Sequence, residues 1–519
     1  MISRLKLWYP FLFAPLPLLN TFTRNPGGSR LDDAAVVVAA VLLACAAGYL
    51  VIAATLRGRV PRPLVPLILL VSILLFYGKS TIGSWTRQVN GVPSAVLLAA
   101  LLLLLGLVIW WVARRPRILD QVNTFFSLTG LLMVGWLGGR LAADLMRGRS
   151  ALRNSALVRE LTQPLSPNPG TAGRGASSRD IYLIVLDEYA NSEILKEQFQ
   201  YDNRRFEDSL RQLGFTIPAV VRSNYVHTLL SLPSLLNFSH LVRVAGEVGT
   251  GSTDATVPNY LVENNRTAAF LKQRGYRFVF FPSQWWPSTR HNRNADWEFN
   301  AWSGFNIARE ASRSDLRRSL VRTTALAFVT RDDAWDADYI RRTLAALEKL
   351  PERAEPTFAF AHIVSPHWPY VFKADCRTSQ RTQFSGRAGR QRAYAEQLQC
   401  LNRLVLHTVS TILQRSAVPP VILLQSDHGT NLLRYSDAKS AKAVTPAQAR
   451  ERFGAFGAYY LPGGGRRLFG DTVTVVNVLQ KVLSHYHGIA VPPEPDDLYL
   501  SLERTPYDFA KVDPATLGN

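Results

Sequence analysis

Cysteine is scarce in this sequence: three occur in 519 residues, Cys45, Cys376 and Cys400. So few thiols exclude a disulfide-rich scaffold and a cysteine-rich metal site. Cys45 lies in a hydrophobic segment, and the other two lie in the later half of the chain. If that half is outside the cytoplasm, Cys376 and Cys400 could form a disulfide; the alternative is two unrelated thiols.

Acidic residues are also few, with 39 Asp and Glu against 59 Lys and Arg, which gives a formal net charge of +20. In a soluble protein this charge would suggest a nucleic-acid partner. The basic residues are spread along the chain, however, with no Lys/Arg run and no nucleic-acid motif. We therefore expect no nucleic acid and favour an anionic membrane surface or an anionic substrate.

Long apolar segments are abundant before residue 150, and most approach the ~20 residues that span a bilayer. The first contains Pro10, Pro15 and Pro17, which predict a kink or an early end. No small-residue cleavage site follows it, so it is expected to be an anchor rather than a signal peptide. The sequence predicts a transmembrane domain, residues 1–150, with about five helices: Leu5–Leu19, Ala34–Ala54, Leu64–Tyr77, Ser94–Val112 and Phe125–Leu141.

Basic residues in alternate loops set the expected orientation. The second-to-third loop carries Arg57, Arg59 and Arg62, and the fourth-to-fifth loop is similarly basic. Such loops stay in the cytoplasm, which places the N-terminus there as well. With an odd number of spans, everything after residue 150 is then expected outside.

Residues 151–179 are rich in Ser, Pro, Gly and Arg and are interpreted as a linker. From Asp180 onward, predicted strands alternate with helices, which indicates an α/β domain with a mostly parallel sheet and helices on both faces. This domain is expected to span 180–490 and to be followed by a C-terminal tail, 491–519. Its predicted strands are Ile181–Leu186, Tyr276–Phe281, Thr357–Val364 and Val421–Gln425, and its predicted helices lie in Arg204–Leu213, Val257–Arg274, Asp338–Leu347 and Arg392–Gln414.

Carboxylates follow two of these strands. Asp187 and Glu188 come directly after the first, and Asp427 and His428 follow the last, before Gly429 in an expected tight turn. Ligands of open α/β sheets bind outside the carboxyl ends of the strands. The four side chains therefore form a candidate site for one divalent ion, either Zn, Mn, Mg or Ca.

Two hydroxyls, Thr228 and Ser231, lie in a segment that is expected to be a loop entering a helix. A helix N-terminus stabilises a bound anion, and a hydroxyl bound to a metal there would be a strong nucleophile. From these residues alone, an ordinary N-cap is the alternative.

Two histidines occur around the end of the strand Thr357–Val364. His367 follows the strand and could face the same site, whereas His362 lies inside it, where a histidine is more often a core residue.

The ordered motifs VLDEYA, HTLLSLPSLLN, HIVSPHWPYVF, QSDHG and FGAYYLP resemble the sulfatase-like branch of the alkaline phosphatase superfamily. Together with the apolar N-terminal segments, they are similar to phosphoethanolamine and glycerolphosphate transferases. The resemblance implies a metal held by Glu188, Asp427 and His428 with Asp187 beside it. It also implies substrate binding by His367, for which His362 is a second candidate.

The resemblance further implies a hydroxyl nucleophile. Thr228-Leu-Leu-Ser231 matches the Thr-x-x-Ser arrangement of the transferases. Sulfatases instead carry Cys/Ser-x-Pro-Ser-Arg, and here Leu235 replaces the arginine while the cysteine is missing. Thr228 is therefore the predicted nucleophile, with Ser231 as the second candidate.

The expected protein is a metalloenzyme of the bacterial inner membrane with its catalytic domain on the periplasmic side. It is expected to transfer phosphoethanolamine or glycerolphosphate from a membrane lipid to an envelope glycan or lipid through a phosphothreonine. A phosphatase or sulfatase, or a non-catalytic envelope-binding protein on the same fold, is the alternative.

Overall fold

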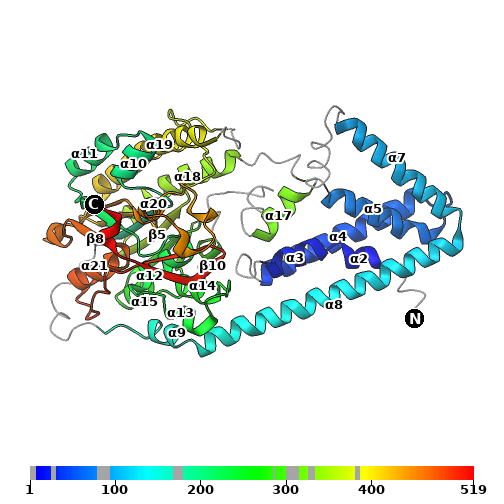
Figure 1. Ribbon diagram of the computed structural model, residues 1–519, viewed down its shortest axis with the longest axis horizontal. Helices are drawn as coiled ribbons and strands as arrows, with labels where there is room; N and C mark the ends of the chain where they lie inside the picture. Colours follow the sequence, from blue (N-terminus) through cyan, green and yellow to red (C-terminus); the bar gives the residue numbers. More distant parts are fainter. Residues whose placement is uncertain are drawn as a thin grey trace. The chain divides into compact units, whose positions relative to one another are not determined.

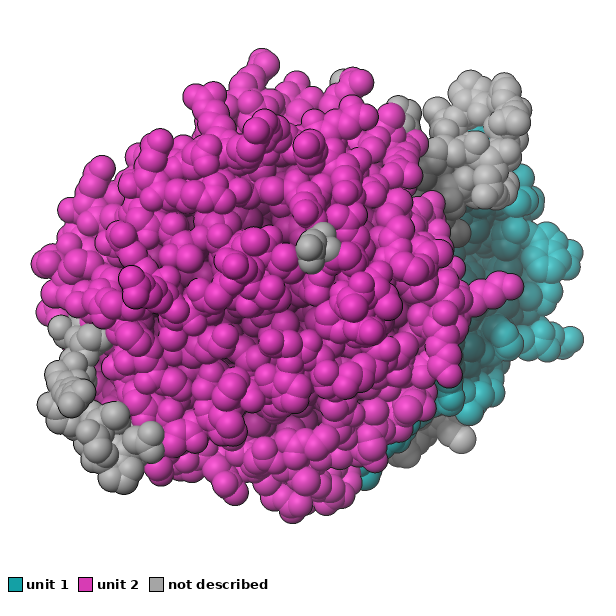
Figure 2. Space-filling view, turned by 60° about the vertical axis from the view of Figure 1, so that its left-hand side comes forward, with its two compact units in different colours: residues 1–147, 305–331 teal, residues 148–304, 332–519 magenta. Residues whose placement is uncertain are grey.

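The computed structural model describes residues 8–24, 31–78, 94–166, 179–283, 287–299, 315–324, 326, 333–379 and 386–518. The chain forms two compact units, coloured separately in Figure 2. Unit 1 comprises residues 1–147 and 305–331, and unit 2 comprises residues 148–304 and 332–519.

In the described residues of unit 1, every regular element is a helix (Figure 1). Three of its helices are long and apolar enough to cross a membrane: α4 (Leu31–Thr55), α7 (Ser94–Ala113) and α8 (Pro116–Asn154), the last of which continues into unit 2. The others are α2 (Tyr9–Phe13), α3 (Leu16–Arg24), η1 (Arg62–Leu64), α5 (Val65–Tyr77) and α17 (Asp315–Thr323).

The prediction of five spanning helices is not confirmed. The first predicted segment is divided around Pro15 into α2 and α3, since proline disrupts the helical hydrogen-bond ladder. The third predicted segment corresponds to α5, whose 13 residues extend only about 20 Å. Hydrocarbon is about 30 Å thick, so α5 is too short to cross it alone.

Side-chain hydrogen bonds hold the short helices of unit 1 to their neighbours. The Tyr9 hydroxyl on α2 donates to Asn123 Oδ1 on α8 at 3.0 Å, and Asn123 Nδ2 donates to the Pro63 carbonyl of η1 at 2.9 Å. The Tyr77 hydroxyl donates to the Ala14 carbonyl at 3.0 Å. These bonds give partners to polar groups that are costly to leave unpaired in an apolar environment.

Unit 2 is built around a six-stranded sheet in the order β4-β3-β5-β1-β6-β7. All neighbouring pairs are parallel except β6 and the edge strand β7. The mostly parallel α/β architecture predicted from the alternating pattern is thus confirmed. The strands are β1 (Ile181–Leu186), β3 (Arg277–Phe281), β4 (Trp297–Glu298), β5 (Thr357–Ile363), β6 (Val421–Gln425) and β7 (Gly457–Tyr460).

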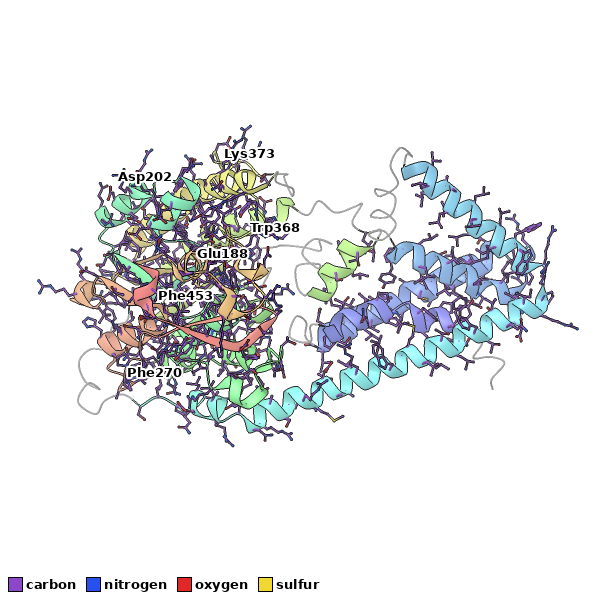
Figure 3. All side chains as sticks on the ribbon, viewed as in Figure 1. Glu188, Asp202, Phe270, Trp368, Lys373 and Phe453 are labelled. Atoms are coloured by element: carbon purple, nitrogen blue, oxygen red, sulfur yellow. A yellow bond between two sulfur atoms is a disulfide. The ribbon has the colours of Figure 1, made fainter. Side chains whose placement is uncertain are left out.

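The central strand β1 is buried on both faces, as its continuous apolar run predicts. Tyr182, Ile184 and Leu186 belong to a core shared with α10, α11, α18 and α19. Its other face belongs to a core shared with α12, α15 and α21. Each fully buried aliphatic side chain contributes about 1.5–3 kcal/mol to the stability of the fold. The strand is therefore held firmly in the sheet, and so are the residues that follow it, Asp187 and Glu188. Figure 3 labels Glu188, which follows β1, and Phe270 of the second core.

The helices of unit 2 largely follow the sequence pattern. One difference is that the expected helix within Val257–Arg274 is two helices, because Asn265 starts a new one: its side chain accepts a hydrogen bond from Ala268 N. The helices are α9 (Ala156–Leu161), α10 (Ser192–Phe199), α11 (Arg204–Gln212), α12 (Thr228–Asn237), α13 (Val244–Val248), α14 (Thr256–Glu263), α15 (Arg266–Gln273), α18 (Asp333–Leu347), α19 (Gly386–Arg415), α20 (Pro446–Phe453) and α21 (Val478–His487).

The predicted linker and tail both contain regular structure. Residues 151–154 continue α8 and are followed by α9, while residues 167–178 lie outside the described residues. The tail contains the antiparallel pair β9 (Leu498–Leu502) and β10 (Thr505–Val512). The remaining elements are the parallel pair β2 (Val220–Arg222) and β8 (Thr472–Thr474), and the short 3-10 helices η2 (Pro287–Thr289), η4 (Leu350–Glu352), η5 (Tyr435–Asp437), η6 (Ala441–Ala443), η7 (Gly465–Arg467), η8 (Val475–Asn477) and η9 (Pro514–Leu517).

Cys376 and Cys400 are joined by a disulfide, and Cys45 is a buried free thiol. The disulfide connects the segment after β5 to helix α19. Of the two alternatives that the sequence left open, a disulfide or two unrelated thiols, the structure has the disulfide.

Candidate active site

The site forms where β1, β5 and β6 end side by side. In register, Val185 of β1 is level with His362 of β5 and with Gln425 of β6. Asp187 and Asp427, each two residues beyond these positions, therefore emerge at the same edge of the sheet. Asp187 and Asp427 are 240 positions apart in the sequence. The parallel arrangement brings them together, because they follow adjacent strands of the sheet.

Asp187, His362 and Asp427 form a buried group whose possible ligand atoms all lie within 4.8 Å of one another. His362 Nε2 is 3.5 Å from Asp187 Oδ2. Asp187 Oδ1 and His362 Nε2 are both buried without a hydrogen-bond partner among the described residues. Burying such atoms without a partner costs folding free energy, unless a further group such as a cation binds to them.

His362 is therefore not a satisfied core histidine, although it lies within β5. Its Nδ1 atom is 3.0 Å from Thr289 Oγ1, and Thr289 Oγ1 is 2.8 Å from Ser283 Oγ. This hydroxyl contact on one ring nitrogen leaves Nε2 facing Asp187, which is the orientation that a metal-binding histidine needs.

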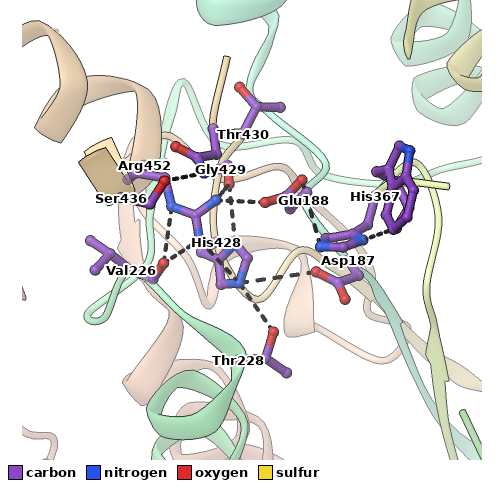
Figure 4. A network of polar contacts seen from close by, with 12 residues as sticks. Asp187, Glu188, Val226, Thr228, His367, His428, Gly429, Thr430, Ser436 and Arg452 are labelled. Carbon is purple, nitrogen blue, oxygen red and sulfur yellow. Dashed lines mark hydrogen bonds and ion pairs between the residues drawn. The ribbon is translucent and has the colours of Figure 1, made fainter. Parts of the chain in front are cut away.

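Thr228, Asp427 and His428 are in mutual contact, and Figure 4 shows Thr228 against His428. The Thr228 hydroxyl donates to Asp427 Oδ2 at 2.7 Å and lies 3.1 Å from His428 Nε2. The other Asp427 oxygen accepts backbone N–H bonds from Glu188 and His428 at 3.3 and 3.0 Å. Asp427 thereby links the Thr228 hydroxyl to the loop that follows β1.

Thr228 is the first residue of α12, and its side chain is only 4% exposed. The first N–H groups of a helix have no partner within the helix and attract anions. Ser231 is differently placed: its hydroxyl donates to the Tyr225 carbonyl at 3.1 Å. Of the two candidate nucleophiles, Thr228 is the one in contact with Asp427 and His428.

Glu188 lies outside the group of three possible ligands. It has a positive φ of 60°, and its Oε1 accepts a hydrogen bond from Arg452 Nη1 at 2.7 Å. Its Oε2 is 4.0 Å from His367 Nε2. In this structure Asp187 rather than Glu188 faces His362, and the role of Glu188 as a metal ligand remains a prediction.

His367 lies at the rim of the site in a loop that Gln397 fixes. Gln397 Nε2 donates to the carbonyls of Pro366 and His367, both at 3.0 Å, and its Oε1 accepts the Val371 N–H at 2.6 Å. The His367 side chain is 25% exposed. It is thus a partly accessible imidazole beside the buried carboxylates.

The carboxyl groups influence each other electrostatically. Burial raises the pKa of Asp427 to about 7, and the neighbouring Asp187 carboxylate adds to the rise. Burial also favours the neutral form of Asp187, but His367, His362 and His428 outweigh it and lower the pKa of that carboxyl. Burial opposes protonation of His367 as well, yet nearby carboxylates raise its pKa overall.

These residues fit a divalent cation. Two buried carboxylates repel each other, and a cation between them removes that repulsion. The oxygen and imidazole donors suit Zn or Mn, and the unpaired atoms of Asp187 and His362 lie where ligands would be required. His428 Nε2, 4.0 Å from Asp187 Oδ1, is a further possible donor.

A close approach of two chain segments requires a glycine at position 429. A Cβ atom here would lie 2.0 Å from the Glu451 carbonyl oxygen and 2.8 Å from that of Gly454. The Gly429 N–H donates to the Arg452 carbonyl at 2.8 Å. The loop that carries Asp427 is therefore pressed against the end of α20.

Sequence reasoning missed Arg452 and Thr289. Arg452 precedes the FGAYYLP motif in an Arg-Glu-Arg run that is typical of an exposed helix. Its neighbour Arg450 does pair with Glu193 and Glu197 at the surface, whereas Arg452 is 2% exposed. Nothing in the local pattern distinguishes the buried arginine from the exposed one.

The sulfatase family model matches residues 184–465, which include every candidate site residue described above. No curated protein matches the chain.

Solved structures with a similar fold include the C-terminal periplasmic domain of EcEptC from Escherichia coli, with 12% identity over 69% of this chain and 97% of that chain (TM-score 0.44). The corresponding domain of phosphoethanolamine transferase EptC from Campylobacter jejuni has 12% identity over 61% and 92% (TM-score 0.39). The lipoteichoic acid synthase LtaP from Listeria monocytogenes has 10% identity over 68% and 81% (TM-score 0.37).

Proposed function

This chain belongs to the sulfatase family, and on that premise we propose that it is a membrane-anchored phosphotransferase that uses Thr228 as its nucleophile. It takes a phospho-substituent, phosphoethanolamine or glycerolphosphate, from a membrane lipid. It then passes the group to an envelope glycan or lipid.

The observation that carries this proposal is the short hydrogen bond from the Thr228 hydroxyl to Asp427 Oδ2, 2.7 Å, with His428 Nε2 3.1 Å away. A hydroxyl is a weak nucleophile unless a neighbouring group accepts its proton or a cation lowers its pKa. Among the described residues, Ser231, three residues later, has only the Tyr225 carbonyl as its hydrogen-bond acceptor.

In the first step, the Thr228 oxygen forms a bond to the phosphorus of the donor lipid. Its proton passes to Asp427 Oδ2, which already accepts the hydrogen bond. The bond between phosphorus and the lipid alcohol breaks, and the alcohol oxygen takes up a proton from solvent. In the second step, an acceptor hydroxyl forms a bond to the same phosphorus and releases its proton to solvent, while the bond between phosphorus and Thr228 breaks and the Thr228 oxygen takes back the proton held by Asp427.

A divalent cation held by Asp187, Asp427 and either histidine, His362 or His428, would supply Lewis-acid charge that neutralises the developing negative charge. The protein also contributes directly. The N-terminus of α12 presents N–H groups to the phosphoryl oxygens. His367, at the rim, is placed to orient the phosphate.

We place the catalytic unit outside the cytoplasm, on a chain anchored in the bacterial inner membrane by the apolar helices of unit 1. Disulfides persist in oxidising compartments, and unit 2 contains one between Cys376 and Cys400. The basic residues Arg114, Arg115 and Arg117 at the start of α8 favour the cytoplasmic side for that end of the helix, which is the orientation that this location requires.

Mass spectrometry of the full-length protein after incubation with vesicles of phosphatidylethanolamine or phosphatidylglycerol tests the proposal. We expect a phosphorus-containing adduct on Thr228, with a mass that identifies the group transferred. Thr228→Ala should abolish the adduct, and the matched variant Ser231→Ala, which removes a hydroxyl from the same helix, should retain it. An adduct on Ser231 would refute the choice of nucleophile.

The same experiment separates transfer from hydrolysis. A transferase should hold the adduct until an acceptor is added, whereas a phosphatase or sulfatase should release the group to water at the same rate with or without acceptor. If neither lipid labels the wild type, the proposed function is wrong for these donors.

A further inference from the structure

Arg452 is the most completely bonded buried charge in the described part of unit 2, and the mechanism above does not use it. Its side chain is 2% exposed and its guanidinium lies 4.7 Å from the centre of the Tyr435 ring. Burying an arginine is costly unless its charge and its donors are satisfied.

Each of the N–H groups of Arg452 has an acceptor within reach (Figure 4). Nη1 donates to Glu188 Oε1 at 2.7 Å and to the Gly429 carbonyl at 2.8 Å. Nε donates to the Val226 carbonyl at 3.0 Å, which Nη2 also contacts. Nη2 is 3.5 Å from His428 Nε2.

These acceptors belong to three separate segments that carry the site. Glu188 follows β1, Val226 lies two residues before Thr228, and Gly429 follows His428. The backbone of Arg452 adds a further bond, because its carbonyl accepts the Gly429 N–H at 2.8 Å. One side chain therefore fixes the relative positions of the three segments.

We propose that Arg452 is a positioning residue for the phosphoryl-transfer site: its guanidinium ties the segments of Glu188, Thr228 and His428 together and so holds the Thr228 hydroxyl against Asp427. This inference rests on the proposed function for its catalytic consequence, although the linkage of the three segments stands on the hydrogen bonds alone.

A simpler role for Arg452 would be that of a counter-charge for Glu188. The bonds to the neutral carbonyls of Val226 and Gly429 argue against it, since charge neutralisation does not require them. Only the planar guanidinium has donors directed to all these acceptors, whereas a lysine ammonium is a compact charge with three donors. Arg452→Lys therefore keeps the charge and removes the linkage.

Amide hydrogen exchange of the full-length protein in detergent tests the linkage without any reaction. We expect Arg452→Lys to increase exchange at least about tenfold in peptides covering 223–231 and 427–434, with the β1 and β6 cores unchanged. The matched control is Arg450→Met on the same helix, which removes only the surface pairs with Glu193 and Glu197. Unchanged exchange in both peptides of Arg452→Lys would overturn the proposal.

The rate of Thr228 labelling by the vesicles tests the catalytic consequence. We expect Arg452→Lys to lower the maximal rate at least about 30-fold, with the lipid concentration at half-maximal rate changed less than threefold. A double-mutant cycle read by amide exchange, which needs no reaction, separates the two roles: in a Glu188→Gln background, Arg452→Met should still increase exchange at least about tenfold in the same two peptides.

If Arg452→Met has no further effect in the Glu188→Gln background, Arg452 serves only as a counter-charge and the proposal is refuted. The Glu188→Gln background also protects the fold, because it does not leave an unpaired buried carboxylate. If wild-type protein takes no label on Thr228, the proposed function fails, while the exchange measurement still decides whether Arg452 links the segments.

Discussion

The two units place apolar side chains in opposite environments. In unit 2, Leu183 at the centre of β1 is 0% exposed, surrounded by helices and neighbouring strands. In unit 1, Leu132 on α8 is 75% exposed and Leu103 on α7 is 66% exposed. The sheet is covered by protein, whereas α7 and α8 expose apolar surfaces and are long and apolar enough to cross a membrane.

The units also differ in where they bury charge. Unit 2 places Asp187, Asp427 and Arg452 in its interior, each at or near the carboxyl ends of the strands. Rigid packing on both faces of β1 makes this possible, because it holds the charges close to partners. In unit 2, the apolar framework therefore positions a few buried charged side chains, Asp187, Asp427 and Arg452.

The largest effect is expected where unit 2 buries its carboxylates. Asp187→Asn should lower the affinity for a divalent ion at least about 100-fold, because it removes the carboxylate charge and a candidate ligand atom that has no hydrogen-bond partner among the described residues. Metal content of purified protein, measured by elemental mass spectrometry over a range of chelator concentrations, checks this.

The matched control is Asp180→Asn, just before the opposite end of β1. Asp180 Oδ1 accepts the Thr357 N–H at 2.7 Å, which an asparagine oxygen can also do. Metal affinity should be unchanged in this variant. Equal losses in the two variants would show that the effect is general destabilisation rather than loss of a ligand.

A second, intermediate effect tests the two apolar environments directly. Leu183→Ala should destabilise unit 2 by about 2–5 kcal/mol, because the cavity forms in packed protein. Leu132→Ala should cost less than about 0.5 kcal/mol in detergent, because its side chain is outside the packed interior. Thermal unfolding midpoints of the purified chain compare the two, and equal shifts would contradict the assignment of Leu132 to a lipid-facing surface.

Of the two destabilisations expected in unit 2, the one with the lower upper bound concerns the thiols. Cys376→Ser should destabilise unit 2 by about 2–4 kcal/mol, because it opens a loop closed across a sequence separation of 24 residues. Cys45→Ser in unit 1 is the matched control, since Cys45 is a free thiol. A reductant should lower the unfolding midpoint of the wild type and of Cys45→Ser, but not that of Cys376→Ser. A wild-type midpoint insensitive to reductant would mean that the disulfide is absent.

Much of the sheet could be predicted because its strands are short, continuous apolar runs. β1 and β6 have the predicted bounds, and β5 differs by one residue. Their parallel pairing follows from the helices between them. The spanning helices were harder, since hydropathy responds to composition and overlooks how Pro15 divides a segment.

For the site, the sequence identified residue types at strand ends but not their partners. Asp187 and Glu188 are adjacent and chemically alike, and only the backbone turn at Glu188 sends one carboxylate toward His362 and the other toward Arg452. His362 was regarded mainly as a core residue because its strand is apolar. Its contact with Thr289 depends on a loop 73 residues away.

The sequence alone determined the apolar framework: which segments are hydrophobic, which strands are buried on both faces, and which polar residues end them. These properties are local, because they depend on the spacing of side chains along the chain. The tertiary structure alone decided which polar groups meet. Register placed Asp187 level with Asp427, and the approach of α20 to Gly429 buried Arg452 among three segments. The contacts of Arg452 with Glu188 and Val226, and the approach of Asp187 to Asp427, join residues more than 200 positions apart, where no local pattern records them.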